Sequence, residues 1–248
     1  MNRAELIAGT HELQRKIGLR HAPLGFFYAD DEPEGFQPPS SNRGCIVAVL
    51  SRARRGEVVY FTAETVGCGG GGTFLGFCAP QAGIAEFIST GIPGKTAGER
   101  YKASPELARA GFERHPAPAA TGRFAVFAPL SLVPEDREPE VIIVFAGADE
   151  LAGLVFLAGF GREDDAVISP FASGCSALVA RPREEARRGL PRAVLGLFDP
   201  SARPCVPPDE LSFAAPRALW EEMVAGAAAS FLSTETWSRV RRRIAGEA

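Results

Sequence analysis

Residues 141–160 read VIIVFAGADELAGLVFLAGF, and this stretch holds both kinds of element that we expect in the fold. Residues 141–145 are apolar and rich in β-branched side chains, which predicts a buried strand. Residues 148–160 predict a helix that follows it directly. A second apolar run, FAVFAP at residues 124–129, predicts another strand just upstream. We therefore expect an α+β or α/β protein, in which mixed sheets are flanked by helices.

The rest of the chain supplies further elements of both types. Helices are predicted over residues 3–17, 81–89 and 104–114, and two closing helices are predicted over residues 216–231 and 234–245. Strands are predicted over residues 23–28, 45–50, 58–62, 193–198 and 210–214. Because a turn sequence, ARRGE, separates CIVAVL at residues 45–50 from VVYFT at residues 58–62, we expect these two strands to form a hairpin.

Composition places the chain among ordinary globular proteins. It has 248 residues, a net charge of −3 and 46% hydrophobic residues, which is consistent with one domain that buries a real core. The slight negative charge argues against nucleic acid as the main partner. No apolar run reaches the roughly 18 residues that span a bilayer, and the N-terminus lacks the features of a signal peptide. These observations predict a cytoplasmic protein without a membrane segment.

An internal repeat is a further candidate feature. Residues 23–34 (PLGFFYADDEPE) and 129–140 (PLSLVPEDREPE) are identical at six of twelve positions, at a constant offset of 106. The offset divides the single domain into two related halves, about 1–122 and 123–248. It also sets Cys68 opposite Gly174, next to Cys175. Equivalent loops of a pseudo-twofold protein can meet, so these two cysteine turns are expected to form one site.

The cysteines are the most informative residues for function. The chain has five, an odd number, and structural disulfides are not expected in a reducing cytosol. Cys68 lies in the run GCGGGG at residues 67–72, and Cys175 lies in SGCS at residues 173–176. No C-x-x-C pair is present, so any metal site must be assembled from distant positions. Candidate ligands are Cys45, Cys68, Cys175 and, less directly, Cys78; a structural role is expected for Cys205.

Three functions are compatible with these residues. The first is a redox or metal-binding protein in which the candidate thiolates hold an iron–sulfur cluster or another soft metal, with a redox partner or small-molecule substrate. The second is a metal-free protein that binds a small anion with the backbone N–H groups of Gly67, Gly69, Gly70 and Gly71. The third is a thiol-dependent enzyme with Cys68 as nucleophile. A flexible surface turn with an incidental cysteine is the non-functional alternative, and whether the protein is an enzyme stays open.

Other motifs are weaker. A GxGxxG match within a glycine run is almost automatic, and the acidic residue expected after a second strand is missing, so dinucleotide binding is disfavoured. GIPGKT at residues 91–96 lacks the first glycine and the strand of a P-loop. The three histidines are scattered and indicate no catalytic arrangement.

The sequence as a whole resembles the uncharacterised ArCR family, domain of unknown function 169. The features that carry the resemblance are PLGFFYADDEPEG at residues 23–35, Cys45, GCGGGGTFLG at 67–76, GCSAL at 174–178 and DELSFAAP at 209–216. The resemblance implies a small α/β protein with cysteines in glycine-rich turns. It makes Cys68 and Cys175 the best-supported site positions, followed by Cys45, but implies no particular activity. The run of four glycines after Cys68 departs from the expected family pattern.

Overall fold

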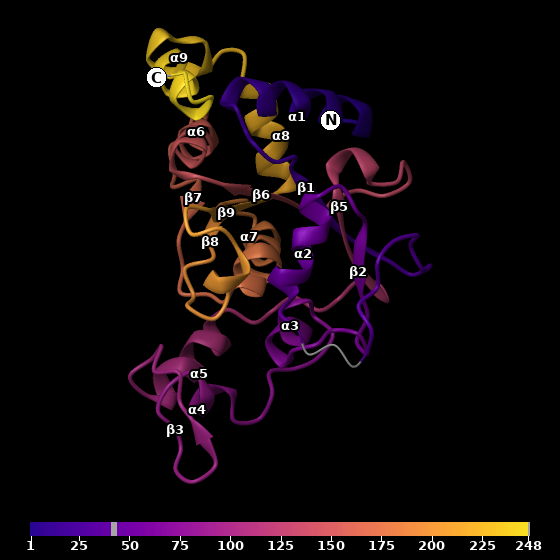
Figure 1. Ribbon diagram of the computed structural model, residues 1–248, viewed down its shortest axis with the longest axis vertical. Coiled ribbons are helices and arrows are strands. Elements are labelled where there is room, and N and C mark those ends of the chain that lie inside the picture. The colour runs from indigo at the N-terminus through magenta and orange to yellow at the C-terminus, as the bar shows by residue number, and fades with distance from the viewer. Residues whose placement is uncertain (41–43, 248) are drawn as a thin grey trace.

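One large mixed sheet forms the centre of the protein. The computed structural model describes residues 1–40 and 44–247. The strand order in the main sheet is β2-β5-β1-β6-β9-β8-β7 (Figure 1), and every neighbouring pair is antiparallel except β7 and β8. The strands are β1 (Leu24–Ala29), β2 (Val59–Phe61), β5 (Phe124–Pro129), β6 (Val141–Ala146), β7 (Val167–Ile168), β8 (Ala193–Gly196) and β9 (Leu211–Pro216). Helices surround the sheet, which confirms the α+β expectation.

The central strands are buried on both faces. Every residue of β1, β5 and β6 is buried, which explains why their sequences are continuous apolar runs and do not alternate between apolar and polar residues. Successive side chains still point to opposite faces. In β1, Phe27 and Ala29 face one hydrophobic cluster, whereas Phe26 and Tyr28 face another.

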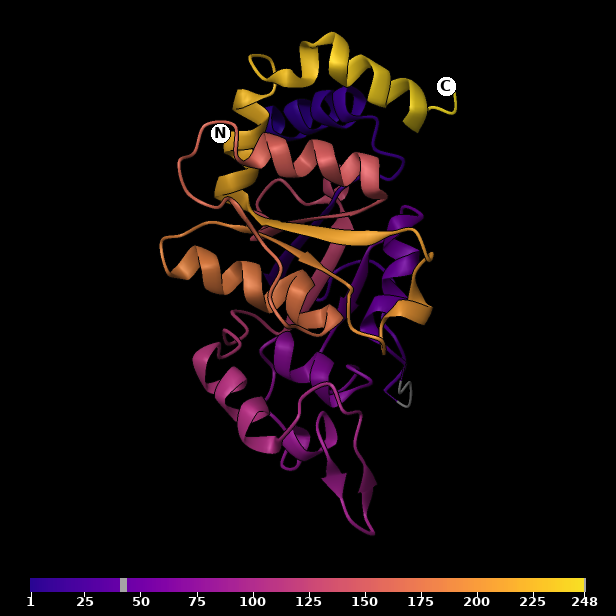
Figure 2. The ribbon, with the colours of Figure 1, turned by 90° about the vertical axis from the view of Figure 1, so that its left-hand side faces the viewer.

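Four helices cover the first face. They are α1 (Arg3–Ile17), α6 (Ala148–Ala158), α8 (Arg217–Gly226) and α9 (Glu235–Ile244), and Figure 2 shows all four on the same side of the sheet, with α9 farthest from it. Each helix contributes a buried side chain to the hydrophobic cluster that lies against the strands: Leu13, Leu154, Trp220 and Trp237. Helix α1 is closed at its start by a capping box between Asn2 and Glu5.

The second face is covered by shorter helices. They are α2 (Ile46–Arg54), α3 (Gly69–Phe74), and α7 (Arg181–Arg187), which continues a π-helical turn at Ser176–Ala180. Leu50 from α2 and Leu178 from the π-helical turn are fully buried against the sheet. This is the face on which the cysteines lie.

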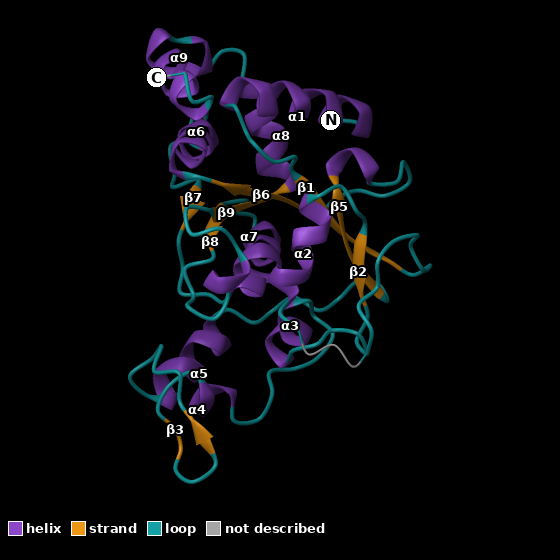
Figure 3. Ribbon diagram, in the orientation of Figure 1, coloured by secondary structure: helices purple, strands orange, loops and turns teal. Residues whose placement is uncertain are grey.

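A small appendage extends beyond the second face. It contains α4 (Ile84–Phe87), α5 (Pro105–Arg114) and a two-stranded sheet of β3 (Gly91–Ile92) and β4 (Thr96–Ala97). Figure 3 shows this hairpin at the end of the molecule opposite α9, separated from the strands of the main sheet by α3 and α7. Helix α5 is capped by Ser104, whose side chain accepts a hydrogen bond from the N–H of Leu107.

One expected strand is wrong. CIVAVL, predicted to be a strand over residues 45–50, lies mostly in helix α2, which Cys45 precedes as the N-cap. The predicted hairpin is wrong as well, because β2 pairs with β5 and not with residues 45–50. The helix is amphipathic: Ile46, Val47, Leu50 and Ala53 are all buried. The burial of this helical face outweighs the modest preference of β-branched residues for strands.

The other expected elements are present, most with small shifts at their ends. The larger differences are in α4, which covers only Ile84–Phe87 of the predicted 81–89, and in α8, which ends at Gly226 and not at residue 231. The short helix α7 and the strands β3, β4 and β7 had not been expected. The two segments that suggested a repeat differ in local structure, since β1 starts at Leu24 whereas Leu130 starts a 3-10 turn. Strands from both sides of residue 122 join in one sheet, and the division into halves stays a prediction.

Within the described ranges 1–40 and 44–247, no helix combines the length and the apolar character needed to cross a bilayer.

Candidate active site

Cys68 and Cys175 lie together although they are far apart in the sequence. Cys68 is the N-cap of α3, and Cys175 lies directly before the π-helical turn that leads into α7. The thiol of Cys175 donates a hydrogen bond to the sulfur of Cys68. The structure therefore brings the two cysteine turns together.

The sulfur of Cys68 is surrounded by hydrogen-bond donors. Besides the Cys175 thiol, the backbone N–H of Gly71 lies 3.2 Å from Sγ, and the N–H of Ile46 also donates to it. Hydrogen bonds to a thiolate stabilise the charged form. The Cys175 contact is the largest effect and outweighs partial burial, so the pKa of Cys68 is lowered to about 6. Cys68 is consequently a thiolate at neutral pH.

Cys175 has the opposite character. It is buried, and its pKa is raised well above the ordinary value because its proton is shared with Cys68 and because burial disfavours a second charge. Gly174 makes this position possible, since a Cβ there would lie 2.9 Å from Cγ2 of Val47 and 3.0 Å from Cδ2 of Leu197. The pair thus consists of a thiolate at Cys68 and a donor thiol at Cys175.

The glycine run brings the α3 backbone close to its neighbours. A Cβ on Gly71 would lie 2.5 Å from Cδ1 of Ile46 and 3.1 Å from Sγ of Cys68, so a side chain at this position would push the Gly71 N–H away from the sulfur. None of the glycines at positions 67–72 has a positive φ. Four of them, from Gly69 onward, start a helix instead of forming the expected irregular turn.

The remaining cysteines are arranged differently. The sulfur of Cys45 is hydrogen-bonded to that of Cys205, and burial raises the pKa of Cys45 to about 11. Cys45 therefore stays protonated at neutral pH. Cys78 is exposed, and its sulfur lies 3.8 Å from Oγ1 of Thr73. Among residues 1–40 and 44–247, no group of three or more His, Cys, Asp or Glu side chains is arranged to hold a metal ion.

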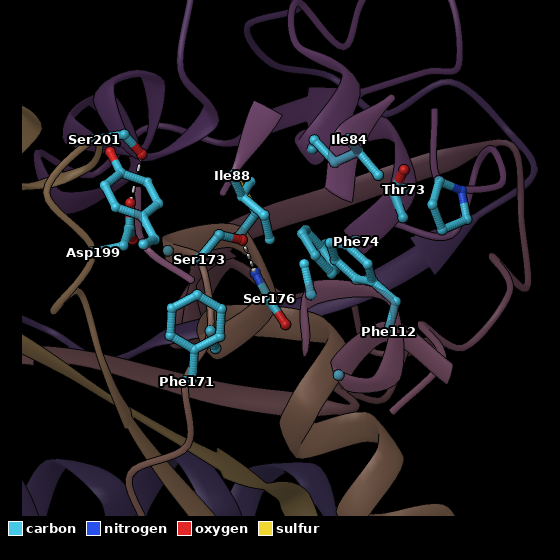
Figure 4. A pocket seen from close by; sticks show the side chains of 18 of the residues that line it. Thr73, Phe74, Ile84, Ile88, Phe112, Phe171, Ser173, Ser176, Asp199 and Ser201 are labelled. Carbon is cyan, nitrogen blue, oxygen red and sulfur yellow. Dashed lines mark hydrogen bonds between the residues drawn. The ribbon is translucent and has the colours of Figure 1, made fainter. Parts of the chain in front are cut away.

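A cavity of about 820 Å³ opens beside the cysteine pair. Cys45, Cys68 and Cys175 line it, as do Gly69, Gly70 and Gly71 of the predicted anion turn, whereas Gly67 and Cys78 do not. The opposite wall is apolar and comes from the appendage and two loops. Figure 4 shows Phe74, Ile84, Ile88, Phe112 and Phe171 around this space.

Arg181 and His115 of the cavity wall have partners within the protein. Arg181 is ion-paired with Glu184 and with Glu185, and Nδ1 of His115 lies 3.2 Å from Oε1 of Glu184. These groups were not identified from the sequence. They come from segments whose proximity no local pattern reveals.

The profile of the uncharacterised ArCR family, domain of unknown function 169, matches residues 12–226. This chain belongs to that family. The matched region runs from within α1 to the last residue of α8, and it contains all five cysteines and the whole cavity wall. The cysteine pair and the apolar cavity therefore lie in the part of the chain that defines an ArCR protein. Neither curated proteins nor solved structures yield a match.

Proposed function

We propose that this ArCR protein is a thiol-dependent enzyme in which Cys68 is the nucleophile. The observation that supports this most is the lowered pKa of Cys68 next to a ligand-sized cavity. A pKa of about 6 makes the thiolate abundant at neutral pH, and cavities of roughly 300–1,000 Å³ are typical of small-molecule sites.

The proposed step is attack of the Cys68 thiolate on an electrophilic carbon of a small organic substrate. For a carbonyl substrate, a bond forms between Sγ and the carbonyl carbon, and the bond to the leaving group breaks. The leaving group departs with the electron pair, so no oxidant or reductant is consumed, and water then hydrolyses the Cys68 thioester to release the acid and restore the thiolate. Cys175 is a positioning residue here, since its thiol donates to Sγ of Cys68 and favours the thiolate.

A reducing, cytoplasmic location is part of the proposal. All five cysteines are free, although Cys68 and Cys175 are in contact, and Cys45 and Cys205 are too. Thiol pairs at such short range persist where the surroundings keep them reduced.

The test uses p-nitrophenyl acetate as an activated acyl donor. Wild-type protein should release p-nitrophenolate and carry an acetyl group on the peptide that contains Cys68, as detected by mass spectrometry. Cys68→Ala should lose both signals, whereas Cys78→Ala, which changes an exposed cysteine outside the cavity lining, should retain them. Equal acetylation of all five cysteines, or none at Cys68, would contradict the proposal.

A soft metal ion is the second candidate, because Cys68 and Cys175 supply two neighbouring sulfurs and Cys45 lines the same cavity. Iron–sulfur clusters usually need four cysteine ligands, so a cluster would require ligands beyond this pair. An absorbance spectrum with iron, zinc and sulfide analysis on protein purified without oxygen tests this candidate. Stoichiometric metal that is lost in Cys68→Ala would support it.

A further inference from the structure

The apolar wall of the cavity is unusually exposed for a folded protein. Phe87, Leu107, Phe171 and Phe198 are 40%, 55%, 59% and 52% exposed, and all four line the cavity. Nine large hydrophobic side chains are exposed in the described part of the chain, so nearly half of them gather at this one site. Such a grouping of exposed apolar side chains marks a binding surface.

The wall is built from separate segments that converge. Phe87 belongs to α4 and Leu107 to α5, whereas Phe171 and Phe198 lie in loops after β7 and β8. Both the main-sheet region and the appendage contribute side chains to this wall. The space between them is not filled by the side chains of either part. A ligand that fills this space would remove these side chains from water. Burial against them lowers the free energy of binding when the ligand surface is apolar, and raises it when the ligand surface is polar.

Most charged side chains on the cavity wall have a partner within the protein. The Lys102 ammonium lies 4.0 Å from the centre of the Phe171 ring. Oδ1 of Asp199 accepts a hydrogen bond from Ser201 at 2.6 Å, whereas its buried Oδ2 has no hydrogen-bond partner among the described residues and would accept a hydrogen bond from a donor group of a neutral ligand. Glu99 accepts one from the Tyr101 hydroxyl at 2.7 Å. Arg181 is ion-paired as described above. Arg114 is exposed to solvent.

We infer that the cavity takes a neutral substrate with a medium-length alkyl chain or an aromatic group, which lies along the phenylalanine wall. This inference names the substrate class of the proposed function. The apolar group contacts Phe171 and Phe198, and the reactive carbon lies at Cys68. An anionic or strongly polar small molecule is not the expected occupant.

The first test measures binding without chemistry. In the Cys68→Ser variant, isothermal titration calorimetry with decanol and with butanol should show at least tenfold tighter binding of decanol. The reason is that each additional methylene group that is buried in the cavity adds to the favourable free energy of binding. Phe171→Ser and Phe198→Ser should each weaken decanol binding by at least threefold. Both side chains are more than half exposed, so these variants should fold. The matched control is Phe156→Ser, since Phe156 is 72% exposed and lies on α6, on the other face of the sheet.

The second test adds the chemistry. Wild-type protein should be acylated at Cys68 at least tenfold faster by p-nitrophenyl octanoate than by the acetate, relative to the rates with free cysteine. Decanol binding without acylation would support the substrate class and contradict the thiol enzyme. Acylation at Cys68 with no preference for the longer chain, together with equal binding of the two alcohols, would overturn the inference and leave the thiol enzyme standing.

Discussion

The Cys175 thiol donates a hydrogen bond to the sulfur of Cys68, across 107 positions of sequence. This contact divides the roles between the two residues, since Cys175 keeps its proton whereas Cys68 is deprotonated. It also joins the start of α3 to the turn before α7, on the wall of the apolar cavity. The account of function given above depends on this contact.

Replacing Cys175 should change the acidity of Cys68. In Cys175→Ala the largest influence that lowers the pKa of Cys68 is lost, so that pKa should rise. Cys175→Ser retains a hydrogen-bond donor of similar size. In this variant the pKa of Cys68 should therefore lie closer to the wild-type value. The pH dependence of Cys68 alkylation by iodoacetamide measures both values. An unchanged midpoint in the alanine variant would show that the backbone donors alone set the pKa.

Two neighbouring glycines should respond differently to alanine. Gly71→Ala places a Cβ 2.5 Å from Cδ1 of Ile46, which should destabilise the protein by about 1–3 kcal/mol. A Cβ on Gly70 meets nothing within 4 Å, so Gly70→Ala should be neutral or stabilise by up to about 1 kcal/mol. Denaturant unfolding of both variants checks this pair. Similar losses in both would mean that the backbone of α3 differs from the one described.

The buried side chain of Arg183 connects several segments near the end of α3 by hydrogen bonds. The side chain of Arg183 donates to Glu140 at 2.7 Å, to the Tyr28 hydroxyl at 2.9 Å and to the carbonyls of Pro118 and Ala119. Tyr28 in turn donates to the carbonyl of Leu75, directly after α3. Because Arg183→Met leaves several buried groups without partners, it should cost about 3–5 kcal/mol.

The control for that prediction is Arg239→Met on α9, whose side chain is 73% exposed. Its effect should stay within about 0.5 kcal/mol, as is usual for surface positions. Thermal or denaturant unfolding measures the difference. If the Arg183 variant unfolded at the same denaturant concentration as the control, the hydrogen-bonding network would contribute no net stability.

Cys45 should be slow to react at neutral pH. Burial raises the pKa of Cys45 to about 11, so little thiolate is present at pH 7. Cys68 should be alkylated long before Cys45 in a time course followed by peptide mass spectrometry. Equal rates at pH 7 would contradict the difference in acidity between the two.

Part of this site could be predicted from the sequence. The offset of 106 paired the turn of Cys68 with the turn of Cys175. CIVAVL was misread because its β-branched residues suggest a strand, although Ile46, Leu50 and Ala53 also recur at helical spacing. That second pattern was available and is the one the structure follows.

The cavity wall could not be predicted in this way. Phe112 lies on α5, whereas Phe171 and Phe198 lie in loops at distant points of the chain. Only the folded arrangement of the appendage beside the sheet brings these rings to one space. Singly exposed apolar residues are common in any sequence, so none of the three indicated a site before their positions were known.

The most direct test of the central claim is the rate of Cys68 alkylation by iodoacetamide between pH 4.5 and 9.5, followed on the peptide that contains Cys68. A lowered pKa means that the thiolate, and so the rate, should rise through a midpoint at about pH 6 and be nearly constant above pH 7. Cys78, for comparison, should serve as the exposed reference thiol in the same samples. A Cys68 midpoint near pH 8.5, the value of an ordinary cysteine, would contradict the assignment of Cys68 as a thiolate nucleophile.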